Sequence, residues 1–340
     1  MTKYNYQKVC SNVLSNLTSE RHRQVLARRF GLKNKRKETL QKIGGDFSVT
    51  RERVRQIENE AFAKLVRQNS QTKSAELKQV FSHFAACLKK NGGLKKEKVL
   101  LNELGGDDFE NHISFLLTLG SQFYRFPETD DTYAFWAFDS AVKKQANEVI
   151  SDLTAEFSKI KKPMPDKAVL VAAKNQNPQF VFASIEVSKK LDKGPLGEIG
   201  LSSWTEIRPR GVRDAAFIAL KSKQNPLHFR EIAQCANDLA GECLGGRKVL
   251  PQTVHNELIR DDRFVLVGRG MYALRDWGYC SGTVKDVITA VLKKAKAPLA
   301  RQKILEAVQE QRLVKDNTVF LNLSDKDYFV RNEKGKYTLV

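Results

Sequence analysis

The amino-acid sequence predicts a mainly α protein with small β wings, in which an N-terminal helix-turn-helix precedes a chain of winged-helix-like units. Three observations predict this fold class. Apolar residues recur at helical spacing between residues 17 and 65. Farther along, helices followed by an aromatic-rich hairpin repeat roughly every 60–70 residues. The 340 residues include 58 Lys and Arg against 39 Asp and Glu, a net charge of +19.

This positive charge requires an acidic partner. Double-stranded DNA fits better than a membrane surface, because the basic residues are spread along the whole chain rather than along one amphipathic helix. The polar start and the short apolar stretches predict neither a signal peptide nor a membrane span. Five cysteines without a C-x-x-C pair predict neither a disulfide framework nor a zinc ribbon. We therefore expect a cytoplasmic protein without a membrane partner.

The first helices are predicted from capping residues. Residues 1–73 carry 17 basic and 6 acidic side chains, the most basic part of the chain. Ser19 in the run 17–20 is typical of a helix start, and Gly31 is typical of a helix end. After a lysine-rich loop at 33–37, Thr39 is expected to cap a short helix with Leu40, Ile43 and Phe47 facing inward.

A longer helix is predicted after Ser48-Val49-Thr50. Its inward stripe recurs every three or four residues and consists of Val54, Ile57, Ala61 and Leu65. The opposite face consists of Glu52, Gln56, Asn59 and Ala63, flanked by Arg53 and Arg55. A short helix, a tight turn and a longer helix form a helix-turn-helix, whose second helix enters the major groove. From periodicity alone, a solvated amphipathic helix fits equally well.

Particular strings favour the first alternative. Val25–Leu32, Thr39–Gly44 and above all Val49–Glu58, which reads Val-Thr-Arg-Glu-Arg-Val-Arg-Gln-Ile-Glu, closely resemble region 4 of bacterial primary sigma factors. The resemblance covers about residues 17–67. It implies an element that reads promoter −35 DNA, and it implies bacterial RNA polymerase core as a partner.

The resemblance also implies roles for individual residues. The positions that match base-reading or backbone-contacting residues of the family are Arg51, Glu52, Arg55 and Gln56. Arg21 and Arg29 match its phosphate contacts, and we add Lys35 and Arg53 as further phosphate-binding candidates. The chemistry agrees, since Arg can take both guanine acceptors, Gln can pair with adenine and Glu can accept from the cytosine amine.

Two departures from the family are expected to matter. Glu60 stands where the family is usually basic, which removes a phosphate contact and adds a negative charge facing DNA. No segment resembles the region that clamps polymerase and melts the −10 element. We therefore expect no transcript from this chain and core polymerase alone, but a changed yield when a complete sigma factor is present.

Four hairpin units are expected after residue 75. Their predicted strand pairs are 123–126 with 133–138, 187–191 with 199–204, 264–267 with 271–274, and 328–330 with 337–340. Helices closed by such a hairpin follow the winged-helix plan. The predicted domains are residues 1–73, 76–140, 143–207, 211–280 and 283–340.

The turn tips of these hairpins differ in charge. Wing contacts to phosphate are predicted for Arg269, Lys334 and Lys336, and the second hairpin carries Lys190 and Lys193. The first tip carries Glu128, Asp130 and Asp131, which phosphate would repel. We expect the first unit to serve as a scaffold or a protein contact.

The third unit has its own resemblance. Pro226–Ile232, followed by Phe264–Leu274 and Trp277, resembles the HARE-type winged helix (HARE-HTH), found also in the delta subunit of bacterial RNA polymerase. The resemblance spans about residues 211–280. Because such modules are also fused to nucleases, it requires that catalysis be weighed.

The catalytic candidates are weak. Asp107-Asp108 and Asp261-Asp262 are more typical of solvated turns than of a metal site. His83 and Cys87 lie one helical turn apart but lack a second ligand pair. His228 and His255 fit packing or helix-start roles better than a general base. We expect no enzyme activity, no catalytic residue, no cofactor and no metal.

The sequence thus predicts a DNA-binding transcription regulator related to sigma factors. An alternative is an architectural or polymerase accessory protein with mainly nonspecific DNA binding, and a nuclease-linked factor is a further alternative. Target promoters, activation or repression, and oligomeric state stay open.

Overall fold

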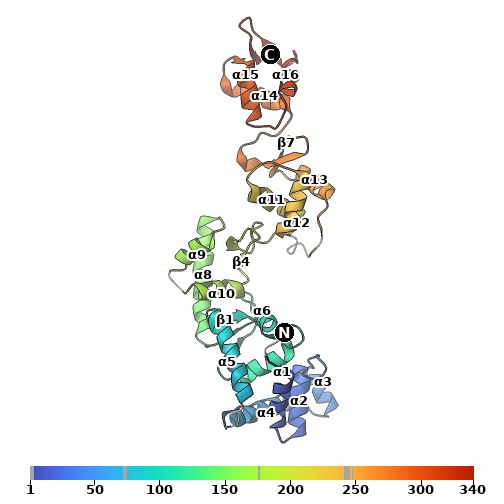
Figure 1. The fold of residues 1–340 in the computed structure, drawn as a ribbon, viewed down its shortest axis with the longest axis vertical. Helices are drawn as coiled ribbons and strands as arrows, with labels where there is room; N and C mark the ends of the chain where they lie inside the picture. The colour runs from blue at the N-terminus through green and yellow to red at the C-terminus, as the bar shows by residue number, and fades with distance from the viewer. Residues whose placement is uncertain (1–3, 72–74, 175–176, 241–245, 247) are drawn as a thin grey trace. The chain divides into compact units, whose positions relative to one another are not determined.

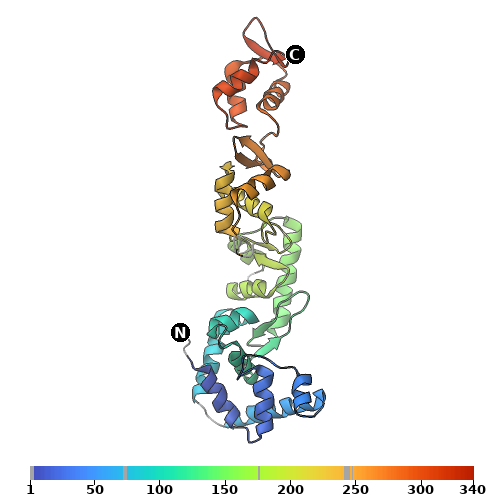
Figure 2. The same ribbon diagram turned by 90° about the vertical axis from the view of Figure 1, so that its right-hand side faces the viewer.

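The computed structural model describes residues 4–71, 75–174, 177–240, 246 and 248–340. It is mainly helical, with short antiparallel strands (Figures 1 and 2). The chain divides into two compact units, residues 1–192 with 199–202, and residues 193–198 with 203–340. Each unit is described by itself below. No helix in the described ranges has the length and apolar character needed to cross a membrane.

The first four helices are α1 (Tyr6–Ser15), α2 (Glu20–Phe30), α3 (Leu40–Asp46) and α4 (Arg51–Gln71). The predicted caps are confirmed: the Ser19 side chain accepts from the His22 amide, and the Thr39 side chain accepts from the Lys42 amide. Gly31 ends α2 with φ +64°. A side chain there would lie 2.7 Å from the Arg36 backbone, so the turn requires glycine.

The inward stripe predicted for α4 is also confirmed, and it divides between two cores. Val54 and Ile57 pack with Val25 of α2 and Ile43 of α3 in a small core inside the helix-turn-helix. Ala61 and Leu65 belong instead to a larger core that reaches beyond residue 100. One stripe therefore joins the helix-turn-helix to the rest of the first unit.

The first hairpin body follows α4. Its elements are α5 (Ala75–Lys90), β1 (Leu94–Lys96), α6 (Glu97–Gly105), α7 (Glu110–Leu119), β2 (Tyr124–Phe126) and β3 (Phe135–Ala137). The antiparallel sheet has the order β1-β3-β2, with Trp136 opposite both Lys95 and Arg125. The sequence predicted the β2–β3 hairpin but missed β1, which is only three residues long.

The helix-turn-helix and this body share one hydrophobic core. Phe115 of α7 is fully buried, and its ring centroid lies 5.4 Å from that of Phe30 and 5.9 Å from that of Phe62. Tyr6 of α1 is equally buried and donates to the Leu104 carbonyl at 3.0 Å. Residues of α1, α2 and α4 thus pack directly on α7.

The second hairpin body consists of α8 (Val142–Ile160), α9 (Asp166–Ala172), α10 (Pro178–Val187), β4 (Leu191–Lys193) and β5 (Ile199–Leu201). The predicted strand 187–191 is wrong, because Val187 ends α10 and the strand begins only at Leu191. α10 packs closely on the turn after α5, where a Cβ on Gly92 would lie 2.5 Å from the Phe180 backbone. The first and second hairpin bodies are therefore in close contact through backbone atoms at Gly92 and Phe180.

The second unit repeats the order helix, strand, two helices and hairpin. Residues 212–277 form α11 (Val212–Lys223), β6 (Leu227–His228), α12 (Phe229–Ala240), α13 (Pro251–Arg260), β7 (Phe264–Gly268), β8 (Met271–Leu274) and the 3₁₀ turn η1 (Arg275–Trp277). Residues 284–339 form α14 (Val284–Ala295), β9 (Leu299–Ala300), α15 (Arg301–Gln309), α16 (Asp316–Leu323), β10 (Phe329–Arg331) and β11 (Lys336–Leu339). Both predicted hairpins are present within one residue at each end.

One buried cation in the first body leads to a testable prediction. Lys95 is 7% exposed, and its ammonium contacts Glu103 and donates to Asn91 at 3.2 Å. The hydrogen bond from Lys95 lowers the pKa of Glu103. A lowered folded-state pKa stabilises the fold above the unfolded value near ~4.3, and this contribution is lost as pH falls through the folded value.

We expect Glu103→Gln to lower the free energy of unfolding by about 1 kcal/mol at neutral pH, a modest value because water screens the half-exposed carboxylate. The deficit relative to wild type should shrink below pH ~4.3. Urea titrations of both proteins between pH 3 and 7 measure it. A deficit that stays constant over this range would contradict the assignment.

Candidate nucleic-acid interface

The outer face of α4 carries all the predicted base-reading residues in exposed positions. Arg51, Glu52, Arg55 and Gln56 lie there together with Arg53. Among the described residues, none accepts a hydrogen bond from the Arg51 guanidinium. Arg51 therefore stands in the first turn of α4 ready for an external acceptor, as guanine readout requires.

The other candidates on this face form pairs. Arg55 donates to both Glu52 oxygens, at 2.6 and 2.9 Å, and these bonds lower the pKa of Glu52. Arg53 donates to Gln56 Oε1 at 3.0 Å. Because exposed pairs of this kind are weak, a base edge can replace them.

Glu60 does not present an uncompensated negative charge. Its carboxylate accepts from Arg53 at 3.4 Å and lies 3.7 Å from His22 Nε2. Burial lowers the pKa of His22, whose Nδ1 has no hydrogen-bond partner among the described residues. This pairing of Glu60 with Arg53, two helical turns earlier, was not expected from the sequence.

The predicted phosphate contacts have different surroundings. Arg21 is exposed and lies over the Phe47 ring at 5.4 Å. Arg29 is half-buried, donates to the Glu38 carbonyl at 3.2 Å and lies 3.7 Å from Glu58. Arg29 is thus held at the junction of α2 and α4.

The basic loop after α2 is fastened to α7. Lys35 pairs with Asp108 at 2.6 Å. The Asn111 amide donates to the carbonyls of Gly31 at 3.3 Å and Lys35 at 3.0 Å. Asn111 was missed by sequence reasoning, because nothing near it in the chain indicates a partner about eighty residues earlier.

The turn between α3 and α4 is set by a close backbone approach. The Val49 amide donates to the Gly44 carbonyl at 2.9 Å. A Cβ on Gly44 would lie 2.6 Å from the Val49 carbonyl oxygen. The turn is tight because Gly44 has no side chain, and this fixes how α4 projects from α3.

The hairpin tips divide into free and engaged ones. Arg269 lies exposed between β7 and β8, and Lys334 and Lys336 lie exposed at the β10–β11 turn. In the first unit, Lys190 pairs with Asp131 at 2.8 Å and Lys189 with Glu128 at 2.5 Å. The acidic tip of the first hairpin therefore makes ion pairs within the chain, and one of them engages Lys190.

The acidic and metal candidates are dispersed. Asp108 pairs with Lys35, Asp261 pairs with Arg263 at 2.7 Å, and Asp262 lies 3.5 Å from Arg275. The His83 ring packs 5.4 Å from that of Tyr4. Across the described ranges, no three His, Cys, Asp or Glu side chains gather closely enough to hold a metal ion.

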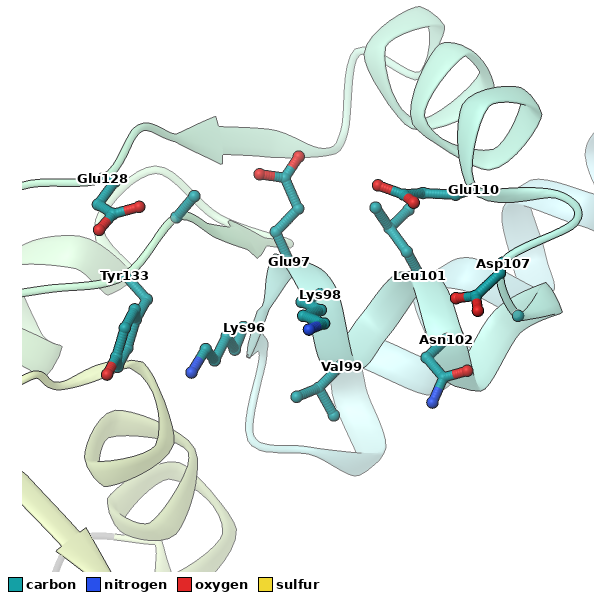
Figure 3. Close-up of a pocket in the computed structure, with 12 residues that line it drawn as sticks. Lys96, Glu97, Lys98, Val99, Leu101, Asn102, Asp107, Glu110, Glu128 and Tyr133 are labelled. Atoms are coloured by element: carbon teal, nitrogen blue, oxygen red, sulfur yellow. The ribbon is translucent and has the colours of Figure 1, made fainter. Parts of the chain in front are cut away.

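A cavity of about 730 Å³ lies in the first hairpin body (Figure 3). Its labelled side chains come from the end of β1, from α6, from the start of α7 and the segment before it, and from the hairpin near Tyr133. Lys96 lies 3.4 Å from the centre of the Tyr133 ring. Glu97 accepts two hydrogen bonds from Arg125, at 2.9 and 2.7 Å. The charges are mixed, and no ligand class follows from them.

The comparisons with known proteins concern the helix-turn-helix. Residues 13–66 match the family model of Sigma-70, region 4. Over 54 residues, the chain is 56% identical to RNA polymerase sigma factor SigA of Microcystis aeruginosa, covering 16% of this chain and 13% of that protein. SigA of Synechocystis sp. is also 56% identical over 54 residues, covering 16% of this chain and 12% of that protein. SigA of a Bacillus species is 54% identical over 54 residues, covering 16% and 14%.

The match supports a sigma-factor-like, DNA-binding helix-turn-helix in the segment predicted from the sequence, and it begins four residues earlier than expected. The chain spans 12% to 14% of the length of these three relatives. In the structure, the matched residues run from the second half of α1 nearly to the end of α4.

Proposed function

We propose that this protein is a DNA-binding transcription regulator that reads −35-like promoter DNA in the major groove through α4. The observation that carries the proposal is the coincidence of the region 4 match with an exposed outer face on α4. Arg51, Glu52, Arg55 and Gln56 are its base-reading side chains. Arg21, Arg29, Lys35 and Arg53 supply phosphate contacts, supported by the net charge of residues 1–73.

The proposal includes association with bacterial RNA polymerase, by analogy with the SigA relatives, and action in the cytoplasm without catalysis. We further infer that residues 76–140, 143–207, 211–280 and 283–340 are winged-helix units, the third of HARE type. The support is their repeated order of helix, strand or bridge, two helices and hairpin.

Gln56→Ala tests the readout. In selection from a randomised duplex library, we expect this variant to lose preference at one base pair, at a cost of about 1–3 kcal/mol for a bidentate contact. Gln79→Ala, which removes an exposed glutamine from α5, is the matched control and should select the wild-type motif. Identical motifs from wild type, Gln56→Ala and Gln79→Ala would show that Gln56 reads no base and that its surface on α4 is only solvated.

A polymerase accessory protein with nonspecific DNA binding is the second candidate. It is favoured by one observation, that the region 4 match covers only 16% of the chain. Pull-down with core polymerase, with and without promoter DNA, separates the two. Capture that needs no DNA and is unaffected by Gln56→Ala favours the accessory protein, whereas capture strengthened by −35-like DNA favours the regulator.

A further inference from the structure

Two hairpins of this chain bind a segment of the following body through backbone groups. In the first hairpin body, the Tyr133 amide donates to the Val187 carbonyl at 2.9 Å. In residues 212–277, β7 is an edge strand, and its Val267 carbonyl accepts from the Leu313 amide at 2.8 Å. Leu313 lies just before α16, in the body that follows. Backbone pairing beyond the hairpin is thus already used within this chain.

The β7–β8 hairpin is also covered on its outer face, the face opposite the helices of its body. Val265, Val267 and Ala273 on this face form a small core of their own. Trp277 and Tyr279, which follow β8, pack against this core. The chain itself therefore covers both the edge and the outer face of this hairpin.

The last hairpin, β10–β11 in residues 284–339, has an open edge. β10 is an edge strand of the sheet. The Val340 amide donates to the Tyr328 carbonyl at 3.1 Å, and the Asn332 amide donates to the Lys336 carbonyl at 2.8 Å. Because ladder bonds involve alternate residues, the amide and carbonyl of Arg331 point away from β11. Among the described residues, none bonds to these two groups.

The outer face of the same hairpin is apolar and exposed. Phe329 and Leu339 point into the core of the body, so the alternate residues Tyr328, Val330 and Val340 lie on the opposite face. These three side chains are 50%, 45% and 76% exposed. A cluster of exposed apolar side chains next to an unpaired strand edge is typical of a protein contact.

Contacts within the body hold this hairpin in place. The Phe329 amide donates to the Asp325 carbonyl at 3.0 Å, and the Asp325 side chain pairs with Lys285 at 2.5 Å. The Lys285 ammonium lies 4.0 Å from the centre of the Tyr328 ring. The edge is therefore already formed before a partner binds, which lowers the entropic cost of binding.

A second copy of the chain fits this edge poorly. A symmetric antiparallel pair of β10 strands centred on Val330 would place Asp327 of one copy opposite Glu333 of the other. It would also place Lys326 opposite Lys334. All four flanking side chains are exposed, and like charges directly opposite one another destabilise a strand pair. The flanking charges therefore favour a different protein as the partner.

The residues of β10 define which sequence fits. An added strand presents alternate side chains to opposite faces of the sheet. On the outer face it meets Tyr328 and Val330, which favours aliphatic side chains. On the other face it meets Arg331, which is exposed and makes no ion pair with any described residue, so an acidic side chain is favoured there.

We propose that the edge of β10, with the outer face formed by Tyr328, Val330 and Val340, binds an extended segment of a partner protein in which aliphatic and acidic residues alternate. This goes beyond the proposed function, since the surface recognises protein and lies outside α4. Lys334, in the turn, lies beyond the strand edge and stays available for phosphate.

A fluorescently labelled peptide of alternating Val and Glu, titrated with the full chain and followed by anisotropy, tests this surface. We expect saturable binding, and Arg331→Glu should weaken it about tenfold, because an attractive cross-strand pair becomes repulsive. Lys303→Glu is the matched control. It changes the charge equally on an exposed residue of α15, directly after the opposite edge strand β9, and should bind the peptide like wild type.

Two further measurements separate strand pairing from charge attraction. A peptide of alternating Pro and Glu has the same charge but lacks the amide donors of Val, and it should not bind. Amide hydrogen exchange, followed by NMR, should slow at Arg331 when the Val and Glu peptide is added. Exchange at Leu313, whose amide is already bonded, should stay unchanged.

Several results would overturn the proposal. Absence of binding, or equal binding of both peptides, would exclude strand addition, and unchanged exchange at Arg331 would place the peptide elsewhere. Exchange at Arg331 that slows with chain concentration alone would assign the edge to a second copy. Slowing by duplex DNA but not by the peptide would assign it to nucleic acid.

Discussion

Phe115→Ala is expected to lower the free energy of unfolding of the first unit by about 3–5 kcal/mol, the range for removing a buried aromatic ring. Phe115 is fully buried against Phe30 and Phe62. Removing the ring leaves a cavity under both α2 and α4. Phe115 itself lies outside residues 13–66, which match the region 4 family model. Specific DNA binding should therefore weaken together with stability.

Urea denaturation and a DNA-binding isotherm at the same temperature measure the two effects. Phe329→Ala is the matched control, because Phe329 is 3% exposed in the core of the last hairpin body. It should destabilise the second unit and leave binding through α4 unchanged. A Phe115→Ala protein that binds DNA like wild type would show that the helix-turn-helix stands without α7.

Gly92→Ala should be the second large effect. Gly92 has φ +75°, and a Cβ there would lie 2.5 Å from both Cα and N of Phe180. Backbone atoms cannot rotate away, so α10 must shift. We expect a loss of about 3 kcal/mol or more, combining overpacking of ~1–3 kcal/mol with a left-handed conformation of ~1–2 kcal/mol.

The neighbouring glycine provides the control. Gly93 has φ +94°, but no atom lies within 4 Å of its Cβ position. Gly93→Ala should therefore cost only the backbone term of ~1–2 kcal/mol. Fluorescence of Trp136, buried in β3 of the same body, can follow unfolding of both variants once Trp204 and Trp277 are replaced by Phe. Equal losses for the two substitutions would mean that α10 does not press on this turn.

Local signals in the sequence predicted much of the fold. Ser19, Thr39 and Gly31 mark helix ends through bonds that span only a few residues, and all three mark them in the structure. The stripe of α4 follows from periodicity alone. Hairpins beginning at Phe264 and near Tyr328 were visible because apolar runs flank a short turn.

Features that depend on distant partners were not predictable. The strands β1, β6 and β9 contain two or three residues each, too few for any alternation to show, and they exist because a hairpin strand pairs with them. Likewise, the pair Lys35–Asp108 joins residues 73 positions apart. α1 is a different case: it was missed although Asn5 caps it and its buried residues Tyr6, Val9, Cys10 and Val13 recur at helical spacing.

The candidate site shows the same division. Exposure of Arg51 and Gln56 followed from helical geometry and family resemblance. Surface ion pairs, by contrast, could not be predicted, because they produce no periodic pattern in a sequence. Three examples are Arg29 with Glu58, Arg53 with Glu60 and Lys190 with Asp131.

The core shared by α4 and α7 constrains how this gene can recombine. A crossover near codon 74 would exchange the sequence of helices α1 to α4 as one piece. It would nevertheless leave Phe30 and Phe62 facing a foreign α7 in one product, and Phe115 facing a foreign α2 and α4 in the other. A viable chimera has to move the whole first unit, residues 4 to about 202, as one cassette, because α10 also packs on Gly92. Under the proposed function, promoter preference should thus evolve by point substitution on the face of α4 more readily than by module exchange.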